Sequence, residues 1–382
     1  MRILIVNYEY PPLGGGGGVA TRDIAVELAE RHEVHVLTSA APGLAGEEVV
    51  DGVRLFRAPV LGRDARSHAS FTSMITFWPI GVWHGRRALK GRYDVVNTWF
   101  AVPSGPTGVW ASRRFKAPHV LTMAGGDIYD PSKWYTPDKN PVLAQVVRRV
   151  LRQADVLAAV STDLAKRAEE MYGLEKEVEV VSLGMNPPDL ADPLPRPDLG
   201  LKADAVYLIS VGRLVRRKNL SVLLRALASV GNSAVELLVV GDGPEREPLE
   251  ALARTLGLSG RVHFKGYVEE DDKHRLLQAA DVFVLPSLHE AFGLVYLEGM
   301  HAGLPVVATK PGGQEDYLID GETGYLVAND DVLALATAIR QLTGDRDLRR
   351  RMGARAKEVA QRFTVASAAA RYEAIFAGLA EK

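Results

Sequence analysis

The sequence predicts an α/β protein made of two doubly wound domains. Short β-branched runs alternate with amphipathic helical patterns such as 21–31, and this alternation stops once and then restarts. Strands are expected at 2–7, 34–38, 53–58, 94–98, 119–123, 156–160 and 178–182, and again at 206–212, 235–241, 262–265, 282–286 and 305–309. Each series is consistent with a parallel sheet covered by helices.

A proline-rich stretch separates the two series. Residues 186–200 (NPPDLADPLPRPDLG) contain five prolines and no apolar periodicity, which is typical of a linker. We therefore expect a first domain at 1–190, a linker at 191–200 and a second domain at 201–363. A terminal helix is expected to follow at about 364–382.

The composition excludes several classes of function. At 382 residues and 47% hydrophobic content, the chain is long enough for two cores. Its net charge of −1 gives no reason to expect a nucleic-acid partner, and the absence of cysteine excludes thiol catalysis and thiolate metal sites. No apolar stretch is long enough for a signal peptide or a membrane span. We therefore expect a cytoplasmic protein.

A run of glycines, Gly14–Gly18, lies between the first expected strand and a helical pattern. Glycine lets backbone N–H groups approach an anion closely, and the start of a helix adds positive charge. Gly15 and Gly16 are therefore candidate phosphate ligands. The run also fits the dinucleotide fingerprint, but no acidic residue ends the second strand, which disfavours a nicotinamide cofactor. A flexible turn is the alternative for the outer glycines.

Polar loops follow several strands of the second half. In an open parallel sheet, ligands bind beyond the carboxyl ends of the strands. These loops contain Arg213 and Lys218, then Gly241, then Glu290 and a pair of glycines at 312–313. Turn geometry alone could explain one such loop, but these loops together with two cations and the carboxylate of Glu290 predict a site for an anionic ligand.

The segment 281–327 carries the most specific pattern. Glu290 lies just before a helix that we expect to begin near Phe292, and Glu298 lies on the second turn of that helix. The backbone N–H groups of Phe292, Gly293, Leu294 and Val295 would suit a diphosphate at the helix start. A carboxylate can accept hydrogen bonds from two adjacent sugar hydroxyls. Alternatively, Glu298 is an exposed helical carboxylate and Glu290 a cap.

This segment resembles the donor-site signature of retaining glycosyltransferases with two Rossmann-like domains, the GT-B fold, and among them glycosyltransferase family 4. The signature is the pair Glu290 and Glu298 with Phe292-Gly293-Leu294 between them. The upstream glycines and cations fall in the family's order, so the resemblance covers nearly the whole chain. It implies two doubly wound domains facing each other across a cleft, with the last helix packed back onto the first, acceptor-side domain.

The resemblance also implies a reaction. A hexosyl unit would move from a UDP- or GDP-linked sugar to a hydroxyl acceptor (glycan, lipid or small molecule), with retained configuration and with neither a metal nor another cofactor. It implies Glu298 for the ribose hydroxyls, Glu290 for hydroxyls of the transferred sugar, and Arg213 and Lys218 for the diphosphate. Spacing alone does not separate these cations from Arg216 and Arg217. A nucleotide-sugar epimerase and a non-catalytic phospho-ligand binding protein are the alternatives.

Two further acidic positions are candidates for acceptor or metal binding. Asp127 follows the expected strand 119–123, where family members often carry a nearby histidine that this chain lacks. Asp127 is the candidate for orienting the acceptor hydroxyl, and a turn-capping aspartate is the alternative. Asp345 and Asp347 form a D-x-D sequence, but a helical pattern follows them, so we expect Asp345 to cap that helix.

Residues 71–92 suggest a contact with a membrane. The segment combines Phe71, Phe77, Trp78 and Trp83 with four basic residues at its end. Aromatic and basic side chains on one helix suit an anionic membrane surface. The alternative is a helix that covers the sheet and keeps its charges in water.

Overall fold

The computed structural model describes residues 1–63, 70–133, 135–187 and 192–380. The chain divides into two units: unit 1 comprises Met1–Met185 and Phe363–Lys382, and unit 2 comprises Asn186–Arg362. The division falls at the start of the proline-rich stretch. The expected domain limit at residues 190 and 191 lies outside the described residues.

Unit 1 is built on an eight-stranded sheet in the order β3-β4-β2-β1-β5-β6-β7-β8. Every described pair of neighbours is parallel except β3–β4. The strands are β1 Arg2–Val6, β2 Glu33–Ser39, β3 Glu47–Val50, β4 Val53–Ala58, β5 Val95–Trp99, β6 His119–Met123, β7 Val156–Ala159 and β8 Val178–Val180. The sequence did not predict β3, because this edge strand is largely exposed and shows no alternation of buried and exposed residues.

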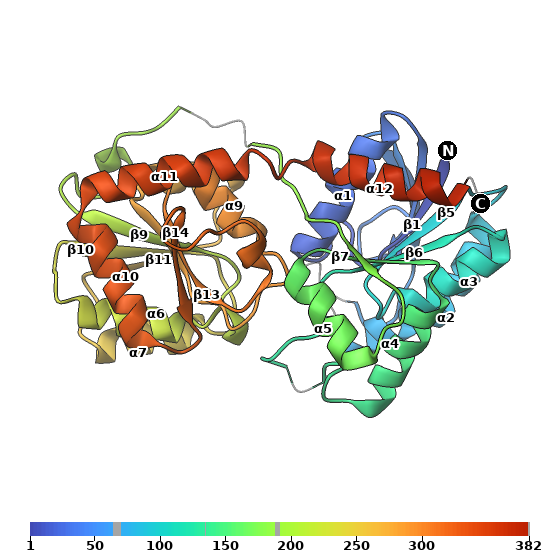
Figure 1. Cartoon of the computed structure of the whole chain (residues 1–382), viewed down its shortest axis with the longest axis horizontal. Coiled ribbons are helices and arrows are strands. Elements are labelled where there is room, and N and C mark those ends of the chain that lie inside the picture. The colour runs from blue at the N-terminus through green and yellow to red at the C-terminus, as the bar shows by residue number, and fades with distance from the viewer. Residues whose placement is uncertain (64–69, 134, 188–191, 381–382) are drawn as a thin grey trace. The chain divides into compact units, whose positions relative to one another are not determined.

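Helices cover both faces of this sheet (Figure 1). They are α1 Gly16–Ala29, α2 Phe71–Ala88, α3 Gly105–Phe115, α4 Pro141–Gln153, α5 Thr162–Tyr172 and α12 Val365–Ala380. α1 packs against α12 on one face, whereas α2, α3 and α4 pack in sequence on the other. α1 begins within the glycine run and not at residue 21 as expected, because glycine has no side chain to contribute to an apolar period.

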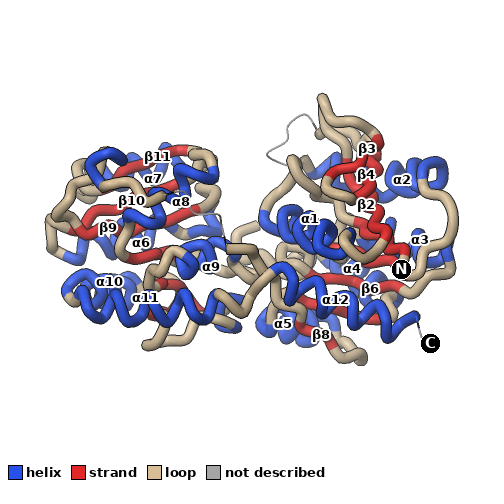
Figure 2. The backbone as a smooth tube through the Cα atoms, turned by 90° about the horizontal axis from the view of Figure 1, so that it is seen from above, coloured by secondary structure: helices blue, strands red, loops and turns tan. Residues whose placement is uncertain are grey.

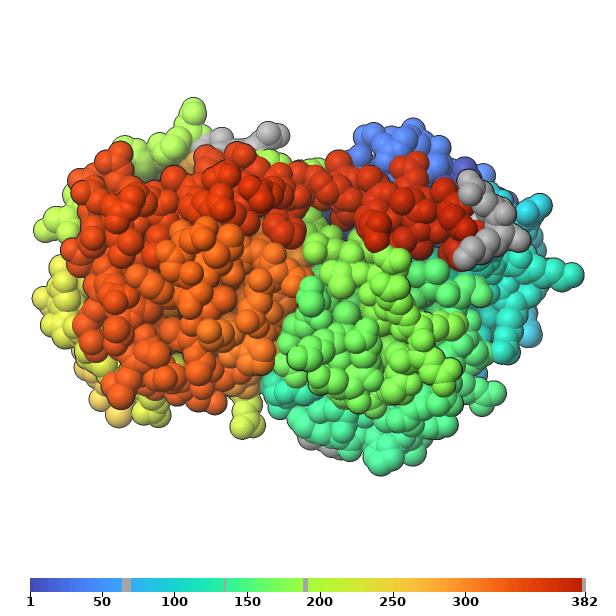
Figure 3. Space-filling view, viewed as in Figure 1, coloured from blue at the N-terminus to red at the C-terminus, as the bar shows by residue number. Residues whose placement is uncertain are grey.

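The last helix belongs to unit 1, although the whole of unit 2 precedes it in the chain. Tyr372 on α12 is fully buried, its hydroxyl lies 3.1 Å from Thr122 Oγ1, and its ring lies 5.8 Å from that of Trp99. Figure 3 shows α12, in red, along the surface of unit 1.

Unit 2 contains a six-stranded sheet in the order β11-β10-β9-β12-β13-β14, with every pair parallel. The strands are β9 Val206–Val211, β10 Val235–Val240, β11 Val262–Gly266, β12 Val282–Leu285, β13 Val306–Lys310 and β14 Gly324–Ala328. The helices are α6 Leu220–Val230, α7 Arg246–Thr255, α8 Glu270–Ala279, α9 Leu294–His301, α10 Val332–Gly344 and α11 Arg346–Ala360. Figure 2 shows both sheets in red with helices in blue around them. The edge strand β14 was not predicted.

The end of the proline-rich stretch differs from the expected linker. Residues Arg196–Leu199 form a short 3₁₀ turn. Arg196 Nη2 lies 2.7 Å from Oδ2 of Asp281, and Arg196 Nε donates to the carbonyl of Ala279 at 3.0 Å. This side chain therefore fastens the stretch to unit 2, which an absence of apolar periodicity does not reveal.

Candidate active site

Two of the predicted donor residues, Lys218 and Glu290, come together at the carboxyl edge of the unit 2 sheet. All strands of this sheet are parallel, so the loops that follow them lie at one edge. The loop after β9 supplies Lys218, and the loop after β12 supplies Glu290. Backbone hydrogen bonds hold the second loop in place: Leu288 N donates to Arg217 O at 2.8 Å, and Gly313 N donates to Glu290 O at 2.8 Å.

Lys218 and Glu290 form a buried ion pair. Lys218 Nζ donates to Oε1 of Glu290 at 2.7 Å. Lys218 is 8% exposed and Glu290 is 6% exposed, so water screens the pair little. Two opposite charges are thus held together at the ligand-binding edge of the sheet.

The cations around Glu290 keep its carboxylate ionised. Burial alone would raise the pKa of Glu290, but the charges of Lys218 and Arg217 outweigh it and lower the pKa to about 2. Arg217 is therefore part of the electrostatic environment, although the sequence analysis did not select it. Its position directly before Lys218, on the 3₁₀ turn Arg216–Lys218, was the available signal. Arg213, by contrast, is exposed.

Two glycines allow this edge to pack closely. Gly212 has φ +147°, and a Cβ there would lie 3.3 Å from Cε of Lys218. Gly241 has φ +128°, and a Cβ there would lie 2.0 Å from the carbonyl oxygen of Gly212. The predicted donor-site residue Gly241 therefore lets the loops after β9 and β10 pack against each other.

The start of α9 is later than expected. Gly293, with φ +88°, precedes the first helical residue, Leu294, whereas the sequence predicted a start near Phe292. Phe292 is buried against Tyr317, whose hydroxyl donates to the carbonyls of Phe292 and Gly293 at 2.6 and 2.8 Å. No acceptor within the described part of the chain takes the N–H of Leu294 or Val295. These two amides are the helix-start donors open to an anion.

Glu298 lies on α9 and contacts a lysine that the sequence analysis missed. Lys273 Nζ on α8 lies 3.0 Å from Oε2 of Glu298 and 2.7 Å from Oε2 of Glu270. Burial raises the pKa of Glu298, and the charge of Lys273 opposes this effect. Lys273 and Glu298 belong to separate helices, so no short motif could have paired them.

In unit 1 the glycine-rich loop already holds a carboxylate. Gly15 lies just before α1 and Gly16 is its first residue. Gly15 N donates to Oε2 of Glu9 at 3.1 Å. A Cβ at Gly17 would lie 2.5 Å from Cζ of Phe100, so this glycine is needed for packing, whereas Gly15 faces open space. The predicted role of Gly15 and Gly16 towards a phosphate stays a prediction.

Asp127 organises the backbone of its loop. It is 3% exposed, and its carboxylate accepts hydrogen bonds from the amides of Ala101 at 2.7 Å, Ala124 at 3.2 Å and Gly125 at 2.8 Å. Burial raises its pKa to about 6, against the opposing effect of these backbone bonds. These contacts fit the turn-capping alternative. A role towards an acceptor stays a prediction.

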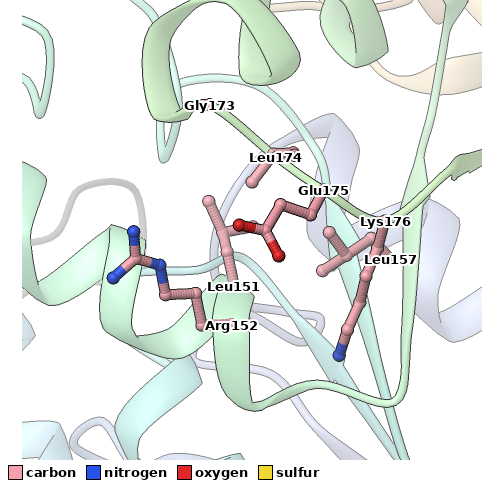
Figure 4. A pocket seen from close by; sticks show the side chains of 7 residues that line it. All are labelled: Leu151, Arg152, Leu157, Gly173, Leu174, Glu175 and Lys176. Carbon is pink, nitrogen blue, oxygen red and sulfur yellow. The ribbon is translucent and has the colours of Figure 1, made fainter.

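Other features lie away from this chemistry. Asp345 Oδ1 accepts from Leu348 N at 2.8 Å, which confirms that it caps α11. A cavity of about 260 Å³ in unit 1 is lined by Leu151, Arg152, Leu157, Gly173, Leu174, Glu175 and Lys176 (Figure 4). It lies at the amino ends of β7 and β8, whereas the loops that contain Gly15 and Asp127 follow the carboxyl ends of strands in the same sheet. Within the described residues, no three His, Cys, Asp or Glu side chains gather as a metal site would require.

Comparison with known proteins covers almost the whole chain. The family model "Glycosyl transferases group 1" matches residues 193–359, and "Glycosyl transferase 4-like domain" matches residues 15–184. The D-inositol 3-phosphate glycosyltransferase of Nocardia farcinica is 31% identical over 96% of this chain and 87% of its own length. The N-acetyl-alpha-D-glucosaminyl L-malate synthase of Bacillus anthracis is 28% identical over 98% and 97%. The sucrose-phosphate synthase structure from Thermosynechococcus elongatus has a TM-score of 0.86, with 25% identity over 99% of both chains.

Proposed function

The chain belongs to the group 1 glycosyltransferases, and from this membership we propose that it transfers a hexosyl unit from a nucleotide-diphosphate sugar to a hydroxyl acceptor with retained configuration and without a metal. Its fold is GT-B, with two Rossmann-like units, as the sequence resemblance implied. The epimerase and the non-catalytic binding protein are not favoured, because the relatives are named for glycosyl transfer or synthesis.

The buried pair of Lys218 and Glu290 beside the start of α9 carries this proposal. A diphosphate needs positive charge and free N–H donors, which Lys218 and the amides of Leu294 and Val295 supply. Sugar hydroxyls need an ionised acceptor, which Glu290 supplies because its pKa is low. We assign Arg213 to the diphosphate as well, on the family pattern alone.

Catalysis would then rest on orientation and charge. As the glycosidic bond to phosphate breaks, negative charge grows on the leaving diphosphate, and Lys218 would stabilise that charge. The family's chemistry is described as front-face substitution, in which the leaving phosphate accepts the acceptor's proton. Removing one such electrostatic contact typically lowers the rate by a factor of about 10²–10³.

The acceptor would bind to unit 1. The two relatives are named for L-malate and for D-inositol 3-phosphate, both of which carry a hydroxyl and an anionic group. A small anionic alcohol is therefore one class of acceptor to test, beside glycans and lipids.

A transfer assay tests the proposal. The protein is incubated with UDP- and GDP-linked hexoses and a panel of anionic alcohols, with and without EDTA, and nucleotide release and product configuration are followed. We expect acceptor-dependent release, an α-linked product from an α-linked donor, and no effect of EDTA. Glu290→Gln and Lys218→Ala should each lower transfer by about 10²-fold or more. Sugar interconversion without release would instead indicate an epimerase, and binding without turnover a binding protein.

We also propose that α2 contacts an anionic membrane surface. Phe71, Ile75 and Trp78 recur at helical spacing along one face and are 60%, 57% and 56% exposed. Trp83 is 51% exposed, and the guanidinium of Arg87 stacks 3.7 Å from the centre of its ring. Residues 71–92 contain no acidic residue and end with four basic ones. Among the described residues, no helix is long and apolar enough to cross a membrane.

Vesicle co-sedimentation tests this contact. Wild-type protein should bind vesicles of phosphatidylcholine with phosphatidylglycerol, bind less to phosphatidylcholine alone, and lose binding at high salt. Trp78→Ala/Trp83→Ala should abolish binding. Val142→Ala/Leu333→Ala is the matched control, because these apolar side chains are 76% and 72% exposed on other helices. Absence of wild-type binding would leave α2 as a solvent-facing cover of the sheet.

A further inference from the structure

A lysine on α8 contacts Glu298, the carboxylate that the family resemblance implies for the ribose hydroxyls. Lys273 is the only described cation paired with Glu298, at 3.0 Å from Oε2, and the side chains of both are largely buried, at 12% and 15% exposure. On its other side Lys273 pairs with Glu270, whose side chain is 73% exposed. The lysine therefore joins a buried carboxylate on α9 to a solvent-facing one on its own helix.

The carboxylate of Glu298 has capacity left for a ligand. Its Oε2 is buried and forms no hydrogen bond of good geometry with any described residue; the contact with Lys273 is an ion pair. A carboxylate oxygen can accept from more than one donor, so the ion pair with Lys273 leaves acceptor capacity on this carboxylate. Two adjacent hydroxyls of a ribose would provide two such donors.

We propose that Lys273 is a positioning residue that holds Glu298 in place, ionised and ready to accept from the ribose hydroxyls of a nucleoside diphosphate. The inference rests on the proposed function. Without the ammonium group, Glu298 would be a buried carboxyl that has lost its ion-pair partner and keeps only the weaker influence of His274, and burial favours the neutral form of such a group. A neutral carboxyl is a weaker acceptor, and one of its oxygens carries a proton that must itself be donated, so it suits two donating hydroxyls less well.

The test measures nucleotide affinity by calorimetry with UDP, GDP and their 2′- and 3′-deoxy forms. Wild-type protein should prefer the ribose form of its nucleotide. Lys273→Met should weaken binding of the ribose form by about tenfold, and bind the deoxy forms nearly as before, so the preference is lost. In the transfer reaction KM for the donor should rise by a similar factor with kcat little changed.

Two further variants separate positioning from general structural damage. Lys273→Arg keeps the charge and should retain most of the preference for ribose. Glu270→Gln is the matched control, because it removes the exposed partner of the same lysine and should change affinity less than twofold. Loss of affinity for ribose and deoxy forms alike in Lys273→Met would overturn the inference, as would wild-type binding by that variant.

Glu298→Ala distinguishes failure of this inference from failure of the proposed function. If Glu298→Ala loses the preference for ribose while Lys273→Met keeps it, the carboxylate binds the ribose and Lys273 does not position it. If Glu298→Ala leaves nucleotide affinity unchanged, or neither nucleotide binds wild-type protein, the assignment of the donor site fails, and the role of Lys273 fails with it.

Discussion

Breaking the Lys218–Glu290 pair should destabilise unit 2, and removing both charges should restore it. The pKa of Glu290 is lowered from 4.5 to about 2, which corresponds to a preference for the ionised form of about 3 kcal/mol. Removal of one partner from a buried pair costs about 3–5 kcal/mol, because the other charge stays buried without compensation. We therefore expect Lys218→Met and Glu290→Leu each to cost about 3 kcal/mol, and the double variant to lie within about 1 kcal/mol of wild type.

Urea unfolding followed by two probes measures this effect. All five tryptophans lie between residues 78 and 134, within unit 1, so tryptophan fluorescence reports on unit 1 and far-ultraviolet circular dichroism on both units. The single variants should shift the dichroism transition. A coupling energy below about 0.5 kcal/mol in the double-mutant cycle would refute the reasoning. Transfer activity should be lost in all three variants, including the stable double one.

The pair also gives a defined pH dependence. A carboxyl whose pKa is lower in the folded protein contributes stability above its unfolded pKa and loses it as pH falls through the folded value. The contribution of Glu290 should therefore be complete above pH 4.5 and disappear between pH 4.5 and about 2. Unfolding of Lys218→Met should show a smaller loss over that interval, because Glu290 then lacks the charge and the hydrogen bond of Lys218 that lower its pKa.

Three further predictions concern folding. The pKa of Asp127 is raised to about 6. Lowering the pH from 7 to 5 should therefore protonate Asp127 and stabilise unit 1 by about 1 kcal/mol, as measured by fluorescence-detected unfolding. Asp127→Asn should lack this gain, and an equal gain in that variant would show that another group is responsible. Gly241→Ala should lower the free energy of unfolding by at least about 2 kcal/mol, because its Cβ would clash with the carbonyl oxygen of Gly212. Gly257 also has a positive φ, +72°, but open space around it, so Gly257→Ala should lower the free energy of unfolding by about 1 kcal/mol. Circular dichroism measures both. Tyr372→Ala should lower the free energy of unfolding by about 3–5 kcal/mol and shift the fluorescence transition, because Tyr372 is buried in unit 1. A shift in the dichroism transition alone would contradict the assignment of α12 to unit 1.

The sequence was most informative where strands are buried on both faces. β12 is a continuous apolar run, and β9 and β10 are interrupted only by Ser210 and Glu236. This pattern is typical of a sheet with helices on both sides, and the positions of these strands were predicted to within a few residues. The two edge strands that were not predicted, β3 and β14, lack this signal, whereas the edge strands β8 and β11 were predicted. β3 is a mostly exposed strand, and β14 is only partly buried, so neither shows a buried run.

The candidate site was predicted at the level of loops but not of contacts. The carboxyl-edge rule and the glutamate pair located Lys218, Glu290 and Glu298 in the chain. Sequence could not decide which cation faces Glu290, because four basic residues occur between 213 and 218 and only folding buries Lys218 while exposing Arg213. Lys273 was not predicted for a similar reason, because its contact with Glu298 depends on how α8 packs beside α9.

The buried pair also fits the two-part nature of the proposed donor. With no ligand bound, Lys218 and Glu290 neutralise each other. A diphosphate would compete with Glu290 for Lys218. Glu290 would then lose part of its interaction with the lysine, which opposes the effect of burial and keeps the carboxylate ionised. Hydroxyls that donate to Glu290 would replace that stabilisation. A nucleotide sugar carries both a diphosphate for Lys218 and hydroxyls for Glu290. A nucleoside diphosphate without the sugar would leave the carboxylate of Glu290 without donors. The site should therefore bind the intact nucleotide sugar more tightly than the nucleotide alone.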